Sequence, residues 1–223
     1  MAEQHKVTLL MSEFVTHDVK RFVISKPAGF TFQPGHGVEL AINQPEWANE
    51  GRPFTPTNFV DDRVLEFTIK AYPEREGVTR ELHRLSPGAE LLLSEPFGTI
   101  NYQGPGVFLA GGAGVTPFIA ILRERARAAD IERNTLIFSN KTPADVIYEK
   151  ELRHYLGERC ILTCTAEKAA GYEHHRIDKT FLAERFTDFS QPFYVCGPPG
   201  FMEAINGALK DLGADPKNLV FER

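Results

Sequence analysis

The pattern of apolar residues changes at Gly104-Pro105-Gly106, and this change constrains the fold more than any other feature of the chain. Before it, short runs such as 64–71 alternate apolar and polar side chains, which predicts half-buried antiparallel strands. After it, continuous apolar runs such as 107–110 are followed by helical patterns, which predicts parallel strands joined by crossover helices. We therefore predict two domains, over residues 1–103 and 104–223.

Turn residues at Pro34-Gly35 and Pro87-Gly88 separate the strand-like runs of the first domain. Strands are expected over residues 7–14, 20–25, 37–42, 64–71 and 90–94, with one short helix over 78–85. Short antiparallel strands at this spacing predict a small closed barrel.

The second domain has the rhythm of a doubly wound α/β sheet. Its strands are expected over 107–110, 135–139, 161–165, 193–196 and 219–221. Thr116 is predicted to cap a helix over 118–128, with Pro117 at the first helical position. Phe201, Ile205, Leu209 and Leu212 predict one apolar face of a last helix.

The composition argues against several classes of function. A net charge of -5 over 223 residues offers no basic surface for nucleic acid, and no run approaches the roughly 20 apolar residues of a membrane span. Three cysteines are too few for an iron–sulfur cluster. Because the first residues lack a signal-peptide pattern, a cytoplasmic location is expected. The adjacent His174 and His175 lack the spacing of metal ligands, so no metal site is predicted.

The glycine-rich segment Gly111-Gly112-Ala113-Gly114-Val115-Thr116-Pro117 lies between a predicted buried strand and a predicted helix. Glycines let the backbone approach a pyrophosphate closely, and the free N–H groups of a helix start favour an anion. The segment therefore indicates dinucleotide binding. A tight turn without a ligand is the alternative interpretation.

Two further segments follow strands of the second domain. Ser139-Asn140-Lys141 stands where many NAD-binding proteins have an acidic residue, and a cation with two neutral donors favours the 2'-phosphate of NADPH over NADH. A solvated loop lysine is the alternative. Cys196-Gly197-Pro198 places a small thiol at a strand end, where ligands of doubly wound folds bind. A buried cysteine with a packing role is the alternative there.

The first domain carries Arg52-Pro53-Phe54-Thr55-Pro56-Thr57 near a strand edge. A guanidinium fork, an aromatic ring and hydroxyl groups suit an aromatic cofactor that bears a phosphate. A strand with a surface salt bridge explains the same residues without a ligand.

These segments occur in the order R-P-F-T, Gly77-Val78-Thr79, G-G-A-G-V-T-P and C-G-P-P-G. In this order, over nearly the whole chain, the sequence resembles the ferredoxin–NADP reductase superfamily. The resemblance implies a six-stranded antiparallel Greek-key β-barrel that binds flavin, and a doubly wound parallel sheet that binds NAD(P). It also implies an enzyme that passes electrons from NADPH or NADH through bound FAD, with FMN as the less favoured cofactor, to flavodoxin or ferredoxin. A reductase component of an oxygenase system, or a non-catalytic flavin-binding electron-transfer subunit, is the alternative.

The resemblance assigns roles to individual residues. Those implied to act in catalysis are Thr55 facing flavin N5, Cys196 beside the nicotinamide, and Glu222 near the flavin. Those implied to bind the flavin are Arg52, Pro53, Phe54, Thr55, Thr57, Ile69, Lys70, Gly77, Val78 and Thr79. Those implied to bind NAD(P) are Gly112, Gly114, Val115, Thr116, Pro117, Ser139, Asn140, Lys141, Cys196, Gly197 and Pro198. Two positions depart from the superfamily pattern, since Phe54 replaces the usual Tyr and the chain ends Phe221-Glu222-Arg223 without a terminal aromatic residue.

Overall fold

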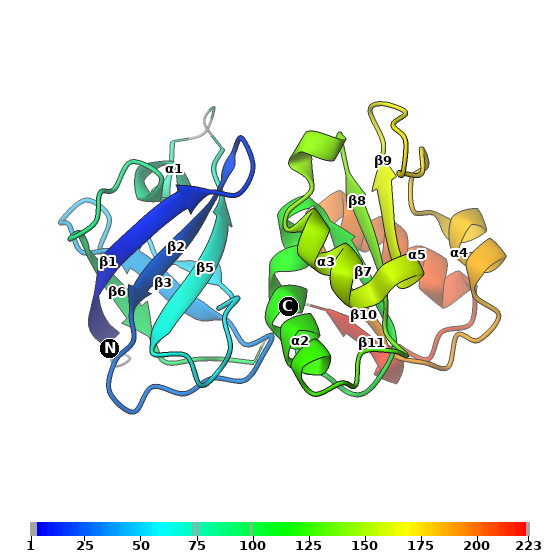
Figure 1. The fold of residues 1–223 in the computed structure, drawn as a ribbon, viewed down its shortest axis with the longest axis horizontal. Coiled ribbons are helices and arrows are strands. Elements are labelled where there is room, and N and C mark those ends of the chain that lie inside the picture. Colours follow the sequence, from blue (N-terminus) through cyan, green and yellow to red (C-terminus); the bar gives the residue numbers. More distant parts are fainter. Residues whose placement is uncertain (1–3, 73, 75, 99, 222–223) are drawn as a thin grey trace.

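The computed structural model describes residues 4–72, 74, 76–98 and 100–221, which form an antiparallel and a parallel sheet side by side (Figure 1). The barrel side of the molecule comes from the first half of the chain, and the layered α/β side comes from the second half.

The antiparallel sheet has six strands and curls into a nearly closed barrel. Its strands are β1 (Gln4–Phe14), β2 (Val19–Ser25), β3 (Val38–Ile42), β4 (Arg52–Phe54), β5 (Val64–Lys70) and β6 (Glu90–Ser94), in the order β4-β3-β6-β1-β2-β5. A bridge between Pro56 and Phe67 joins the two edges of this sheet. The short helix α1 (Val78–Leu82) buries Val78 and Leu82 in the barrel core.

The second sheet has five parallel strands in the order β11-β10-β7-β8-β9. They are β7 (Val107–Gly111), β8 (Thr135–Asn140), β9 (Cys160–Cys164), β10 (Phe193–Cys196) and β11 (Leu219–Phe221). The chain runs from β7 outward to β9 and then returns to β10 on the other side of β7. The winding direction therefore reverses between β7 and β10, and ligands of doubly wound folds bind at the carboxyl ends of strands at such a reversal.

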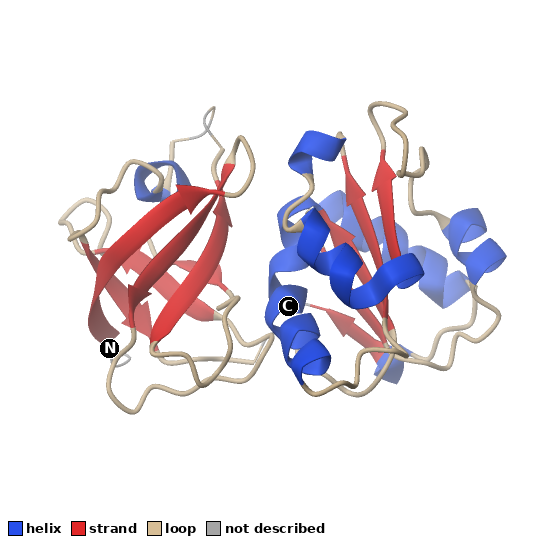
Figure 2. Cartoon of the chain, in the orientation of Figure 1, coloured by secondary structure: helices blue, strands red, loops and turns tan. Residues whose placement is uncertain are grey.

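Helices cover both faces of the parallel sheet (Figure 2). They are α2 (Thr116–Arg127), α3 (Glu149–Leu156), α4 (Lys179–Arg185) and α5 (Pro199–Asp211). Along β7, Phe108 and Ala110 pack into the core under α2 and α3, whereas Val107 and Leu109 pack into the core under α4 and α5. This burial on both faces explains the continuous apolar run in the sequence.

The predicted fold class, a Greek-key barrel followed by a doubly wound parallel sheet, is confirmed. One local prediction is wrong: Thr116 does not cap α2. Gly112–Val115 form a 3-10 turn that runs directly into α2, so the helical segment begins within the glycines. The helix over 78–85 is shorter than predicted, and the predicted boundary between residues 103 and 104 stays a prediction. Among the described residues, no helix has both the length and the hydropathy to cross a membrane.

Candidate active site

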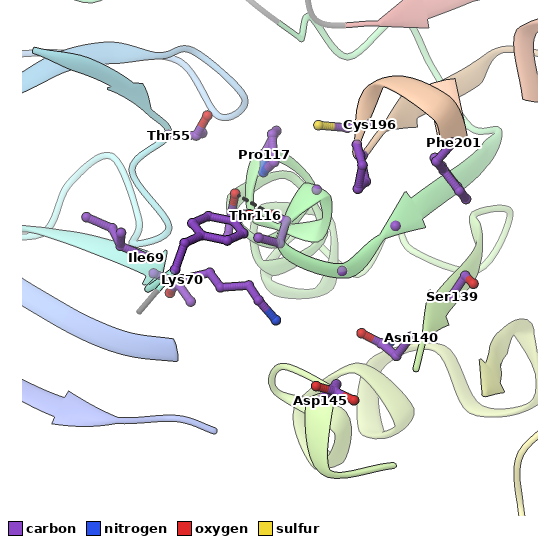
Figure 3. Close-up of a pocket in the computed structure, with 18 of the residues that line it drawn as sticks. Thr55, Ile69, Lys70, Thr116, Pro117, Ser139, Asn140, Asp145, Cys196 and Phe201 are labelled. Carbon is purple, nitrogen blue, oxygen red and sulfur yellow. Dashed lines mark hydrogen bonds between the residues drawn. The ribbon is translucent and has the colours of Figure 1, made fainter. Parts of the chain in front are cut away.

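A cavity of about 710 Å³ lies between the barrel and the carboxyl ends of β7, β8 and β10. Figure 3 shows Thr55, Ile69 and Lys70 on its barrel side, facing Thr116, Pro117 and Cys196. Among the described residues of the barrel, those that line it are Pro53, Phe54, Thr55, Thr68, Ile69, Lys70, Tyr72 and Thr79. A volume of this size is typical of sites for ligands as large as a cofactor.

The glycine turn forms the floor of the cavity at the end of β7. Gly112 has a φ of 53°, a left-handed conformation that glycine adopts without strain. Because Gly112–Val115 are the first helical turn, the N–H groups that have no partner within the helix belong to the glycine segment itself. The backbone here therefore presents donors and a partial positive charge to the cavity.

Close packing joins the glycine turn to the end of β10. A Cβ on Gly114 would overlap the carbonyl group of Cys196, and a Cβ on Gly197 would lie 2.6 Å from Phe201. The Phe201 ring also packs against Gly111. Glycine is required at Gly114 and Gly197 because the two turns approach each other without room for a side chain.

Cys196 and Thr55 face the cavity from opposite sides, and each is only 5% exposed (Figure 3). Cys196 is the last residue of β10, so the register of the parallel sheet fixes its position beside Ala110 at the end of β7. Both side chains are small, which leaves the space between them open to planar rings.

Asn140, at the end of β8, has an unusual environment. The residue is 5% exposed, and among the described residues neither its side-chain nitrogen nor its side-chain oxygen has a hydrogen-bond partner. Asn140 lines the cavity next to Ser139 and the exposed Lys141. Since buried polar groups are almost always satisfied, this amide indicates a polar ligand group at this end of the cavity.

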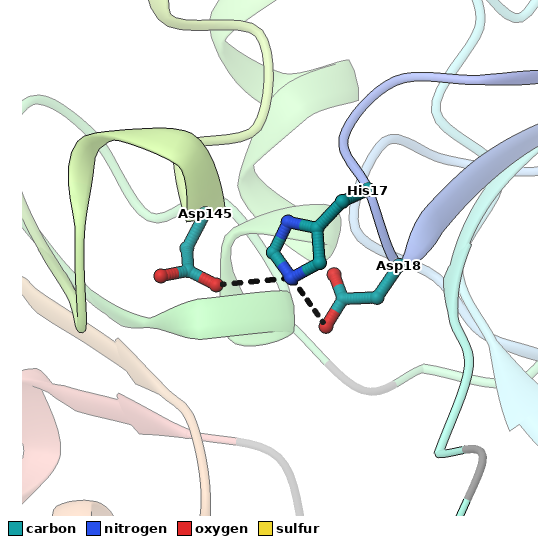
Figure 4. A group of neighbouring side chains, drawn as sticks. All are labelled: His17, Asp18 and Asp145. Carbon is teal, nitrogen blue, oxygen red and sulfur yellow. Dashed lines mark ion pairs between the residues drawn. The ribbon is translucent and has the colours of Figure 1, made fainter.

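A charged cluster lies where the barrel approaches the loop after β8 (Figure 4). His17 lies 3.6 Å from Asp18 and 3.8 Å from Asp145, and the Lys70 ammonium lies 2.7 Å from Asp18. Burial alone would raise the pKa of Asp18, but the hydrogen bond and charge of Lys70 outweigh it and hold that pKa below its usual range. The ligand atoms of His17, Asp18 and Asp145 lie within 4.8 Å of one another, but Lys70 already supplies a cation to Asp18. That the chain binds no metal stays a prediction.

Comparisons with known proteins agree with this arrangement. The model of the oxidoreductase NAD-binding domain family matches residues 108–207. The chain is 26% identical over 227 residues to the ferredoxin–NAD(P)+ reductase component of the naphthalene 1,2-dioxygenase system of Pseudomonas putida, covering 96% of this chain and 67% of the relative. It is 30% identical over 203 residues to NADH-cytochrome b5 reductase 2 of Lodderomyces elongisporus, covering 76% of this chain and 66% of that relative.

The FAD/NAD-binding domain of a nitric oxide dioxygenase from Vibrio cholerae has the same fold. Its TM-score to this chain is 0.86 at 21% identity, and the alignment covers 99% of this chain and 98% of that domain. The chain belongs to the ferredoxin–NADP reductase superfamily. As a member of this superfamily, it is an electron-transfer oxidoreductase.

Most of the residues that the superfamily pattern singles out come together at the cavity. On the nucleotide side these are Gly112, Gly114, Thr116, Pro117, Ser139, Asn140, Lys141, Cys196, Gly197 and Pro198. On the barrel side they are Pro53, Phe54, Thr55, Ile69, Lys70 and Thr79. Residues more than 100 positions apart in the sequence thus line one site.

Several predicted cofactor contacts lie elsewhere. Arg52 is directed to Glu50, with its guanidinium 3.4 Å from that carboxylate and 2.8 Å from the carbonyl oxygen of Gly51. Thr57 is fully buried and donates to Glu66, so its side chain is part of the barrel interior. Three further predicted contacts do not line the cavity: Gly77 caps α1, and Val78 and Val115 are buried in the cores. Glu222 lies outside the described residues.

Other residues of the cavity carry no sequence motif for cofactor binding and were not predicted there. They are Thr68, Tyr72, Asp145, Thr165 and Phe201. Gly111, Ala113 and Pro199 also line the cavity and lie within the motifs already described. The sequence pattern placed Phe201 on the core face of the last helix. Its ring also packs against Gly111 and Gly197, and the only sequence signal for this contact is the G-P-P-G turn that precedes Phe201. Thr68 belongs to the polar face of β5, which the alternation pattern assigned to solvent.

Proposed function

We propose that this chain is a NAD(P)H-dependent flavin reductase that passes electrons from NAD(P)H through bound FAD to a separate one-electron acceptor. The observation that carries the proposal is that one cavity has the glycine turn of the parallel sheet on one side and Pro53, Phe54 and Thr55 of the barrel on the other. When bound, FAD accepts a hydride as an electron pair and releases the electrons singly.

The barrel side of the cavity fits an isoalloxazine ring. Phe54 and Ile69 offer apolar surface, and the hydroxyl groups of Thr55 and Thr79 offer hydrogen bonds to ring or ribityl atoms. Thr55 is the residue that we assign to flavin N5. The Arg52 guanidinium pairs with Glu50, so it has to leave this carboxylate to reach a flavin phosphate.

The sheet side fits a dinucleotide. The N–H groups of the glycine turn bind the pyrophosphate, and the orphaned amide of Asn140 binds a ribose or phosphate oxygen. Cys196 and Pro117 border the nicotinamide, and they hold it against the flavin while excluding water. The protein thereby positions the two rings, and its side chains take no part in bond making.

Titration with each flavin and a coupled assay test this assignment. We expect the protein to bind FAD more tightly than FMN, and the FAD-loaded protein to reduce ferricyanide with NAD(P)H as the electron donor. A protein that binds neither flavin, or an FAD-loaded protein inactive with both coenzymes, would contradict the proposal.

Lys141 supports a preference for NADPH over NADH. It is exposed, follows the cavity residue Asn140, and has no acidic neighbour at the end of β8 to bind a ribose diol. We expect Lys141→Ala to lower kcat/KM for NADPH about 10- to 100-fold and to leave that for NADH nearly unchanged, since one charge-assisted contact is worth roughly 1.5 to 3 kcal/mol. Lys150→Ala, at an exposed lysine of α3, is the control. A wild-type protein that prefers NADH, or an unchanged preference in the variant, would refute the role of Lys141.

The acceptor that we propose is a small one-electron carrier protein, ferredoxin or flavodoxin. The Pseudomonas putida relative, named as a ferredoxin reductase component of an oxygenase system, supports this choice, whereas the Lodderomyces elongisporus relative favours cytochrome b5. Steady-state reduction of purified ferredoxin, flavodoxin and cytochrome b5 by the same preparation decides among them. Faster turnover with cytochrome b5 than with both other carriers would overturn the choice.

A further inference from the structure

A buried arginine joins the two sides of the cavity. Arg123 lies on α2, seven residues after Thr116, and only 13% of its side chain is exposed. Its guanidinium donates to the carboxylate of Glu66 on β5 at 2.8 Å and to the carbonyl oxygen of Thr57 at 2.6 Å. On its own side it donates to the carboxylate of Glu151 on α3 at 2.6 Å and 3.0 Å.

The barrel partners of Arg123 belong to the segment proposed to hold the flavin. Thr57 follows Thr55 by two residues, its N–H donates to the carbonyl oxygen of Glu66 at 2.7 Å, and its hydroxyl donates to the Glu66 carboxylate at 2.8 Å. The Arg123 guanidinium therefore bonds both β5 and the loop after β4. This loop also carries Thr55.

The other end of α2 lies at the nucleotide side of the cavity. Thr116 and Pro117 line the cavity, and about two helical turns, roughly 10 Å of rigid helix, separate them from Arg123. The chain of contacts thus runs from Pro117 through α2 and Arg123 to Thr57 and Thr55. Both walls of the cavity are attached to the same helix.

Tyr148 makes a second connection next to the first. Its ring lies 5.1 Å from the Arg123 guanidinium, and its hydroxyl is 3.1 Å from the hydroxyl of Thr68, which lines the cavity. The residue has a φ of 52°, which is uncommon for a residue with a side chain. A strained backbone persists only where the surrounding residues hold it. Here the strained residue is the one whose hydroxyl group reaches Thr68 of the barrel.

Opposite charges alternate along this network. Arg21 lies 3.4 Å from Glu66 and 3.0 Å from Glu13, so two guanidinium groups alternate with the three carboxylates of Glu13, Glu66 and Glu151. Burial alone would lower the pKa of Arg123, but the hydrogen bonds and charges of Glu151 and Glu66 outweigh it and raise that pKa. Arg123 therefore stays a cation between its two carboxylate partners.

We propose that Arg123 is a positioning residue for hydride transfer: by bonding Thr57 and Glu66 it fixes the distance between the nucleotide wall and the flavin wall of the cavity. This inference rests on the proposed function. It concerns a step that requires the reacting rings within about 3 to 3.5 Å, where a displacement of about 1 Å costs about 100-fold in rate.

The test compares Arg123→Met with a matched control, Arg127→Met. Arg127 lies one turn further along α2 and also pairs with the barrel, 2.7 Å from Asp61, but its side chain is 46% exposed. In Arg123→Met we expect anaerobic reduction of bound FAD by saturating NADPH to slow about 10- to 100-fold, while the Kd for FAD stays within about threefold of wild type. Reduction of the same flavin by dithionite, which needs no bound nucleotide, should keep its rate. Arg127→Met should match wild type in every measurement.

A readout independent of turnover accompanies these rates. Hydrogen–deuterium exchange of the segment that contains Thr57 should accelerate in Arg123→Met without added coenzyme, and should not change in Arg127→Met. Arg123→Lys, which keeps a charge and one donor, should restore part of the reduction rate. If Arg123→Met does not fold, Arg123→Lys and Glu151→Gln are used for the test. Each should slow reduction of the flavin by NADPH but leave its reduction by dithionite unchanged.

The outcomes separate the two proposals. A wild-type protein whose bound FAD is not reduced by either coenzyme would refute the proposed function. A wild type that is reduced, with Arg123 variants reduced equally fast, would refute the positioning role alone. Equal slowing with NADPH and dithionite would also refute it, because the flavin site itself would then have changed.

Discussion

At the scale of single residues, Cys196 offers the sharpest test of direct hydride transfer. It is 5% exposed at the end of β10 and lines the cavity where we place the nicotinamide. Because sulfur is larger and less polar than oxygen, Cys196→Ser should leave the fold and FAD binding intact but slow flavin reduction about 10- to 100-fold, as expected of a misplaced ring. Stopped-flow absorbance measures this step.

Cys160→Ser is the control for that prediction, because Cys160 is equally buried in the same sheet but lies outside the cavity. The rate of flavin reduction in Cys160→Ser should equal that in wild type. A Cys196→Ser variant that is as fast as wild type would remove Cys196 from the active site, and a thiol adduct trapped during turnover would contradict direct transfer.

Residue identities in the site could be read from the sequence better than side-chain directions. Thr55, Gly114 and Cys196 were expected at the site and lie at the cavity, because glycine spacing and strand ends fix backbone positions. The direction of Arg52 depends on Glu50, and the role of Thr57 depends on Glu66. Such pairings rest on side-chain contacts that no motif encodes.

At the scale of elements, the glycine turn has no room for an added side chain, whereas helix α5 has room for one at Gly207. A Cβ at Gly114 would overlap the carbonyl group of Cys196, whereas a Cβ at Gly207, inside α5, would contact nothing within 4 Å. We expect Gly114→Ala to lower the free energy of unfolding by about 1–3 kcal/mol through overpacking. Gly207→Ala should raise it by about 0.5–1 kcal/mol, since alanine favours a helix interior.

Urea denaturation of the two variants without cofactor measures both changes against wild type. A Gly114→Ala variant as stable as wild type would show that the two turns can move apart. A loss of stability in Gly207→Ala would show that α5 is constrained there in a way that the packing around it does not reveal.

The strands of both sheets were largely predictable because hydrophobic periodicity sets them. The sequence of β5 alternates apolar and polar residues, but Glu66 and Thr68 on its polar side are buried as well, so the prediction of a half-buried strand is wrong there. β7 is apolar throughout because its neighbouring residues enter different cores. Helices α3 and α4 were not predicted, and the start of α2 was misplaced because glycines seldom begin a helical turn. Local propensity does not reveal such features when packing decides them.

At the scale of the whole molecule, function depends on how the barrel and the parallel sheet face each other. Arg123 joins Glu66 of the barrel to Glu151 of helix α3. In the chain, Glu66 is 57 positions from Arg123, and Glu151 is 28 positions from it. Sequence patterns are local, so this network was invisible before the fold was known. It places the two binding surfaces around one cavity, on which the proposed activity depends.

We propose that this cavity brings NAD(P)H and FAD into contact for hydride transfer. The most direct test mixes FAD-loaded protein with stoichiometric NADPH without oxygen and follows the visible flavin absorbance. We predict complete bleaching in a single turnover, faster with NADPH than with NADH. A protein that binds FAD and coenzyme but keeps its full flavin absorbance with both coenzymes would contradict the account.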